Sequence, residues 1–122
     1  MEGDADFVIC NFDGLDIVKE AVIKNGFDLI IIDEANAYKN VSTKRWKVLN
    51  SILTPSTWVW MMTGTPAAQS PTDAYGLAKI VNPNNVPKFF GAFRDRVLTK
   101  ITQEFDAYRT GETGTAKEMA RV

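Results

Sequence analysis

The sequence predicts an α/β fold with about three parallel strands and flanking helices, and two features support this prediction. An apolar run at residues 27–32 ends in the tetrad DEAN, and a second apolar run at residues 57–62 ends in the tetrad TGTP. Buried parallel strands are continuous apolar stretches of this kind. Segments with helical periodicity separate the runs, and a β-α-β order implies parallel strands joined by right-handed crossovers.

The first expected element is a short buried strand at residues 7–10 (FVIC), in which Cys10 would be a small buried hydrophobic residue. Asp13 is expected to cap a helix over residues 14–25, because its carboxylate can accept hydrogen bonds from free N–H groups of the first turn. Gly26 is expected to end that helix.

The next elements are the strand at residues 27–32 and, after a loop, a helix over residues 42–53 that Ser42 is expected to cap. A proline with small polar neighbours ends the helical pattern, and residues 57–62 form the third expected strand. The apolar positions of the second helix share one face, which leaves its lysines on the other. These apolar residues are Trp46, Leu49, Ile52 and Leu53.

The remaining sequence predicts a helical C-terminal segment. Pro71 opens a helix that ends near residues 82–83, and a phenylalanine-rich stretch at residues 89–93 indicates another helix. We expect residues 1–101 to form one domain and residues 102–122 to form a tail that is helical or partly disordered.

The composition is that of an ordinary globular domain and excludes several classes of protein. The chain has 122 residues, of which 45% are apolar and 24% are charged. One cysteine allows no disulfide framework, and without histidine neither histidine catalysis nor a zinc site is expected. No apolar stretch reaches membrane-spanning length, and the N-terminus lacks the basic start of a signal peptide. We therefore expect a cytoplasmic protein, or one in a nucleoid or viral replication context, that is not secreted and has no membrane partner.

The net charge of -1 hides a strong asymmetry along the chain. Residues 1–38 contain nine acidic residues and two lysines, whereas residues 39–100 contain nine basic residues and two acidic ones. A polarised distribution of this kind suggests that the middle of the chain faces a polyanion. A basic helix face that is merely solvated is the alternative.

Asp33 and Glu34 follow an apolar run, at the end of a parallel strand where ligands bind. Two carboxylates there can hold Mg²⁺ through water and polarise a water molecule against a nucleotide phosphate. The alternative for this motif alone is a strand that ends in an acidic loop. Thr63 and Thr65, at the end of the next strand, favour a nucleotide-hydrolase core.

Taken together, these motifs resemble the second half of the first motor lobe of superfamily-two helicases, nearest to the chromatin-remodelling and DNA-translocase branch. The resemblance covers roughly residues 6–100 and implies a partial RecA-like three-layer fold. The matching segments are FVICNFDGL at 7–15 (motif Ib), IIIDEAN at 30–36 (motif II), MTGTPAAQS at 62–70 (motif III), LAKIVNP at 77–83 and the stretch at 89–96.

The resemblance implies roles for the residues of motifs II and III. Asp33 would contact Mg²⁺ through water, and Glu34 would orient or deprotonate the attacking water. Asn36, Thr63, Gly64 and Thr65 would couple the nucleotide site to the nucleic-acid site. The family usually has histidine or glutamine where this chain has Asn36, whose shorter side chain still donates and accepts hydrogen bonds. The threonines could instead satisfy backbone groups of a turn.

The resemblance also implies weak contacts with the phosphate backbone of DNA. Such contacts position a duplex without reading its sequence. Plain solvated charges are the alternative for the lysines. The residues expected to make these contacts are Asn11, Lys39, Lys44, Arg45 and Lys47.

One feature of the helicase motor is absent from the 122 residues. No glycine-rich loop of the form G-x-x-x-x-G-K followed by Ser or Thr occurs, so no lysine cradles the terminal phosphates. We therefore expect a fragment of a DNA-dependent ATPase that is inactive alone. The resemblance implies that the intact parent protein binds Mg²⁺ and ATP. The alternative is that this chain binds no cofactor.

Two further hypotheses stay open. The chain could be a non-catalytic module that binds nucleic acid or protein. It could also self-assemble as a homo-oligomer, through an exposed sheet edge at residues 57–62 or through swapped C-terminal helices.

Overall fold

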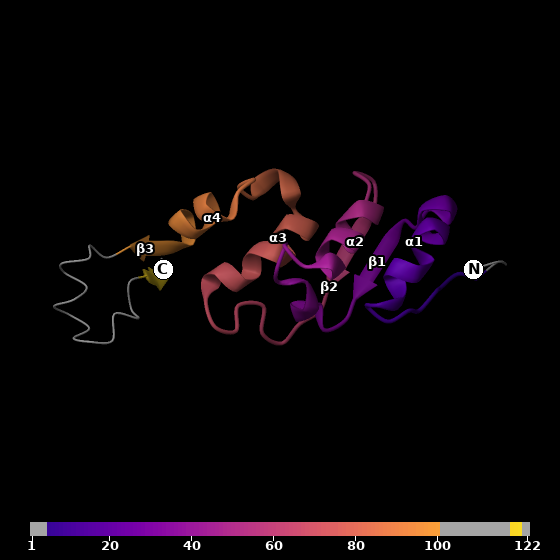
Figure 1. The fold of residues 1–122 in the computed structure, drawn as a ribbon, viewed down its shortest axis with the longest axis horizontal. Helices are drawn as coiled ribbons and strands as arrows, with labels where there is room; N and C mark the ends of the chain where they lie inside the picture. The colour runs from indigo at the N-terminus through magenta and orange to yellow at the C-terminus, as the bar shows by residue number, and fades with distance from the viewer. Residues whose placement is uncertain (1–4, 101–117, 121–122) are drawn as a thin grey trace.

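The computed structural model describes residues 5–100 and 118–120, in which helices and strands follow one another along the long axis of the molecule (Figure 1). Helix α1 (Gly14–Asn25) lies at one end and strand β3 (Leu98–Lys100) lies toward the other. The fold belongs to the α/β class, as predicted.

Two parallel strands form the central sheet. Strand β1 (Leu29–Ile32) pairs with β2 (Trp58–Met61), in a register that sets Leu29 opposite Trp58 and Ile32 opposite Met61. Backbone hydrogen bonds extend the ladder at both ends: the Trp58 N–H donates to Asp28 O, and the Met62 N–H donates to Ile32 O, each at 2.8 Å. The two apolar runs are therefore strands, as the sequence predicts.

The first expected strand, at residues 7–10, is a wrong prediction. This segment forms no strand, and the side chains of Phe7 and Ile9 are 83% and 96% exposed. Cys10 is exposed as well, so it is not the buried residue that the sequence suggested. An apolar run becomes a strand only where its backbone finds a ladder partner, and no described strand pairs with this one.

Helix α1 ends as predicted, but it begins differently. Gly26 has a φ of 66°, a left-handed value that glycine adopts without strain. Asp13 occupies the N-terminal cap position without making a capping hydrogen bond. The Gly14 N–H instead donates to the side-chain oxygen of Asn11 at 2.6 Å.

Helix α2 (Lys44–Ile52) is capped one residue later than expected. The Thr43 hydroxyl accepts a hydrogen bond from the Trp46 N–H at 3.2 Å, whereas Ser42 bonds to the side chain of Asn40. The predicted apolar face is confirmed for Trp46, Leu49 and Ile52, which are buried.

The segment after Ser70 contains short helices in place of one long helix. A 3-10 turn, η2 (Pro71–Ala74), carries a capping box between Ser70 and Asp73 and leads into α3 (Tyr75–Val81). A further turn, η3 (Pro83–Asn85), precedes α4 (Phe90–Val97), which is the helix expected from the phenylalanine-rich stretch.

One hydrophobic core joins β1, α2, α3 and the 3-10 turn η1 (Ala35–Tyr38). Leu15 and Val22 of α1 pack against the same cluster. Helices α1, α2 and α3 therefore pack on one face of the sheet, as expected for α1 and α2, but only α2 joins two parallel strands and so forms a right-handed crossover. The other face is open in the described residues, so the second helical layer of a three-layer fold is not seen there. Its exposed side chains are Leu29, Ile31, Trp58 and Trp60.

A second pair of strands is antiparallel. β3 pairs with β4 (Glu118–Ala120), with Leu98 opposite Ala120. Residues 118–120 are thus a strand, where the sequence suggested helix or disorder. The rest of the segment expected to form a tail lies outside the described residues. Within the described part of the chain, no helix is long and apolar enough to cross a membrane.

Candidate functional site

Asp33 and Glu34 lie directly beyond β1, and both are exposed. Glu34 has φ 51° and ψ 50°, which makes it the one non-glycine residue with positive φ among the described residues. The Glu34 N–H donates to the Asp33 carboxylate at 2.9 Å. A left-handed backbone costs about 1–3 kcal/mol for such a residue and is found most often at functional sites. Residue type alone does not predict this conformation at Glu34.

Hydrogen bonds connect the segments that follow β1 and β2. The Thr63 hydroxyl donates to the Asn36 side-chain oxygen at 2.7 Å, and the Asn36 amide donates to the Thr65 hydroxyl at 3.0 Å. The Thr65 N–H donates back to the Thr63 hydroxyl at 3.3 Å. The Asn36–Thr63–Thr65 bridge thus ties the DEAN turn to the TGTP turn through side chains that the sequence had grouped together.

Gly64 takes no part in this bridge. A Cβ atom placed on Gly64 would meet nothing within 4 Å, and its φ is not in the left-handed region. The structure therefore gives no steric reason for glycine here.

The donor set beside the bridge suits a hydrated divalent ion better than a directly bound one. Within the described residues, no group of three or more His, Cys, Asp or Glu side chains could hold a metal. Mg²⁺ commonly keeps several waters and uses one or two carboxylates together with substrate phosphates. Asp33 and Glu34 fit that partial role, whereas the sequence contains no loop that would cradle the phosphates.

Two of the predicted DNA contacts are ion-paired with α1. Lys44 Nζ lies 2.6 Å from the Asp16 carboxylate, and Arg45 Nη2 lies 2.9 Å from the Asp13 carboxylate. The hydrogen bond that Lys44 donates to the Asp16 carboxylate raises the pKa of Lys44. The Arg45 guanidinium also stacks 5.0 Å above the ring of Phe12.

The other predicted contacts have different surroundings. Asn11 caps α1 through its side-chain oxygen. Lys39 and Lys47 are exposed and form no ion pair with another described residue. Lys47 follows Lys44 by three residues on α2, so both lie on neighbouring parts of the helix surface.

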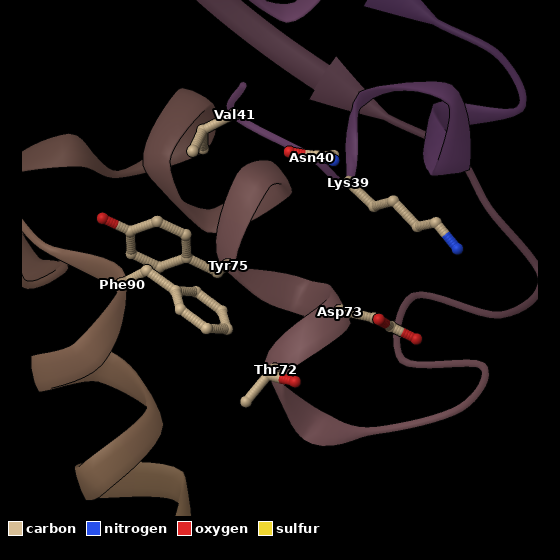
Figure 2. Close-up of a pocket in the computed structure, with 7 residues that line it drawn as sticks. All are labelled: Lys39, Asn40, Val41, Thr72, Asp73, Tyr75 and Phe90. Carbon is tan, nitrogen blue, oxygen red and sulfur yellow. The ribbon is translucent and has the colours of Figure 1, made fainter. Parts of the chain in front are cut away.

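A cleft that the sequence did not predict opens between residues 39–41, η2 and the first residues of α3 and α4 (Figure 2). Its volume is about 300 Å³, with Lys39 and Asp73 on one side and the rings of Tyr75 and Phe90 on the other. The Tyr75 hydroxyl is bonded to the backbone oxygens of Pro87 and Lys88 at 3.1 and 2.8 Å. Burial raises the pKa of Tyr75. These hydrogen bonds therefore hold the backbone at Pro87 and Lys88, after α3, against the Tyr75 side chain.

The position of α3 depends on a close backbone approach that the sequence also did not reveal. The Trp46 indole N–H donates to the buried Gly76 carbonyl at 2.9 Å. A Cβ atom on Gly76 would lie 2.2 Å from the Lys39 carbonyl oxygen. The available signal was a glycine inside an otherwise regular helical segment, YGLAKIV.

Comparison with known proteins identifies relatives. The sequence model of the SNF2-related domain matches residues 1–122. A SWI/SNF-related matrix-associated actin-dependent regulator of chromatin, subfamily A-like protein 1, from Xenopus laevis is 36% identical over 81 residues, which is 66% of this chain and 8% of that protein. The protein of the same name from Xenopus tropicalis is 38% identical over 63 residues, 52% of this chain and 7% of that protein. The Bos taurus protein is 33% identical over 70 residues, 57% of this chain and 7% of that protein. This chain therefore spans less than a tenth of the length of these relatives. No solved structure matches it.

Proposed function

The chain belongs to the SNF2-related domain family, and from that premise we propose that it is part of a RecA-like motor lobe of a DNA-dependent ATPase. In this proposal it carries the residues that activate water and couple the nucleotide site to DNA. It does not hydrolyse ATP on its own, because its sequence has no phosphate-binding loop.

The Asn36–Thr63–Thr65 bridge is the observation that best supports this function. It connects the turn that holds Asp33 and Glu34 to the turn after β2. In this proposal a change at one turn reaches the other through these hydrogen bonds, since coupling can be carried by a contiguous hydrogen-bond network. The bridge, with Gly64, is proposed as the coupling element.

The hydrolytic roles are proposed for the two carboxylates. Asp33 would hold Mg²⁺ through water, and Glu34 would orient or deprotonate the attacking water. When bound with ATP, Mg²⁺ supplies charge neutralisation at the transferred phosphate. The exposed position of both carboxylates beyond β1 leaves them accessible to a nucleotide held by other residues of a complete motor.

DNA is the proposed partner of the basic middle of the chain. The relatives are named as regulators of chromatin, and the polarised charge suits a polyanion. Contacts with phosphates would be weak and independent of sequence. We propose that the protein acts where DNA is present, and that its contacts come from Asn11, Lys39, Lys44, Arg45 and Lys47.

Measurement of phosphate release tests the catalytic part of the proposal. The chain alone, with Mg²⁺, ATP and DNA, is expected to release phosphate no faster than its Glu34→Gln variant. Phosphoryl transfer depends on positioning and on electrostatic stabilisation by phosphate-binding groups, and these are missing here. Steady-state turnover that Glu34→Gln abolishes would contradict the proposal.

A second candidate function is a non-catalytic module that binds another protein chain. The open apolar face of the sheet favours it, because Trp58 and Trp60 are 71% and 59% exposed. Large exposed apolar patches mark interaction sites. In this alternative, the chain forms a homo-oligomer through the open face and edge of the sheet.

A further inference from the structure

At the start of α2, the two cations expected to contact DNA phosphates are already paired with carboxylates. Asp16 pairs with Lys44, and Asp13 pairs with Arg45. Both acids come from α1 or the residue before it, which lies far from α2 in the sequence. The four groups together carry no net charge, so this surface has no excess of positive charge to attract a polyanion.

The two pairs differ in which partner is exposed. In the Lys44–Asp16 pair the side chains are 80% and 42% exposed, and in the Arg45–Asp13 pair they are 34% and 86% exposed. Arg45 also contacts the ring of Phe12. Each pair thus has one well-exposed member, and because exposed ion pairs are weak, a competing anion can displace either acid.

We propose that Asp13 and Asp16 are internal competitors of DNA phosphates for Lys44 and Arg45, so that the start of α1 forms an acidic cover that weakens nucleic-acid binding. This inference rests on the proposed DNA-binding function and adds a means of its regulation. Lys39 and Lys47, which form no ion pair within the described part of the chain, provide the residual affinity, and displacement of the cover adds two further contacts.

The salt dependence of DNA binding measures how many cations contact phosphates. Each phosphate neutralised on duplex DNA contributes about 0.9 to the negative slope of log affinity against log salt. Binding of a labelled random-sequence duplex is measured by fluorescence anisotropy between about 50 and 200 mM salt, a range over which such contacts change affinity strongly.

The Asp13→Asn/Asp16→Asn variant is expected to bind several-fold more tightly at low salt, with a slope steeper by about 1.8, which is two contacts at about 0.9 each. Adding Lys44→Gln and Arg45→Gln should remove this gain. When Asp13 and Asp16 are retained, Lys44→Gln and Arg45→Gln should alter DNA binding little, because the two acids already pair with these cations. The single variant Asp16→Asn, with an expected change in slope of about 0.9, tests one pair alone where the double variant fails to fold.

A charge-matched control separates the cover from a general change in net charge. Glu20 and Asp28 are exposed and pair with no basic side chain in the described residues. Glu20→Gln/Asp28→Asn changes the net charge as much and should leave the slope unchanged. An equal gain in this control would overturn the proposal.

The remaining outcomes distinguish failure of the acidic cover from failure of the DNA-binding function. Binding by the unchanged chain, together with no change in Asp13→Asn/Asp16→Asn, would refute the acidic cover and leave DNA binding intact. A fall in thermal stability without a change in DNA binding would show that the pairs only fasten α1 to α2, which also refutes it. Absence of binding by every variant at low salt would refute the DNA-binding function and the cover together.

Discussion

Gly76 shows how a single hydrogen atom in place of a side chain determines the packing of α3 against η1. The carbonyl oxygens of Tyr38 and Lys39 would lie 2.4 and 2.2 Å from a Cβ atom at this position. Both are backbone atoms, so they cannot move aside as the end of a flexible side chain could. Gly64, in the TGTP turn, has no such neighbour.

Gly76→Ala is therefore expected to destabilise the chain by about 1–3 kcal/mol, because the added methyl group forces the backbones apart. The better helix propensity of alanine, about 1 kcal/mol, offsets only part of this. Gly64→Ala is the matched control, with an expected change within about 0.5 kcal/mol. Urea unfolding of both variants measures the difference, and equal stabilities would show that the close approach is not maintained in solution.

For the candidate functional residues, the sequence predicts position along the chain better than local conformation or partner. Asp33 and Glu34 could be placed at a strand end, because an apolar run followed by charged residues indicates where the strand stops. The left-handed backbone of Glu34 could not, since it depends on the turn rather than on residue type. Asn11 was predicted to contact DNA, which stays a prediction, and the structure adds that its side-chain oxygen accepts a hydrogen bond from the Gly14 N–H. Residue type gives the chemistry of a side chain, and only the surrounding fold decides which partner it takes.

At the scale of secondary-structure elements, the helix caps are decided by which side chain reaches the first turn. In α2, Thr43 accepts from the Trp46 N–H, while Ser42 points to Asn40. Both are good capping residues, so composition alone does not choose between them.

Thr43→Ala is expected to lower the stability by about 0.5–2 kcal/mol, because an N–H group of the first turn of α2 loses its acceptor. Ser42→Ala is expected to cost less, and Thr43→Ser should retain the cap. Thermal unfolding by circular dichroism compares the three. A larger loss of stability for Ser42→Ala than for Thr43→Ala would show that Ser42 caps α2 in solution, as the sequence first suggested.

Elements stabilised by local contacts were predicted well, and those that need a distant partner were not. The helices α1 and α2, and the turn at Gly26, follow from residues close together in sequence. Residues 7–10 are as apolar as a strand should be, but their backbone has no ladder partner among the described strands. Hydrophobicity shows that a segment favours burial and does not specify what covers it.

In the molecule as a whole, helices cover one face of the sheet and leave the other face open within the described residues. Ile30, Ile32, Val59 and Met61 face the helices, and the alternate residues of both strands face away. β2 pairs with β1 along one edge, and no described strand pairs with its other edge. An uncharged strand with an open edge and two exposed tryptophans is prone to pair with another chain.

A second copy of the chain is the occupant that we predict for this face. Trp58 and Trp60 offer large apolar area without opposing charge, and burying it between two copies is favourable by about 25 cal/mol per Å². Light scattering over a range of concentrations is expected to show association. Trp58→Lys/Trp60→Lys should shift the chain toward monomer, because lysine on the face cannot be buried unpaired. Ile17→Lys is the control, since Ile17 is 85% exposed on α1 and contributes nothing to the sheet face. A monomer at every concentration for the unchanged chain would exclude this assembly, and the open face would then remain in contact with solvent in the chain alone.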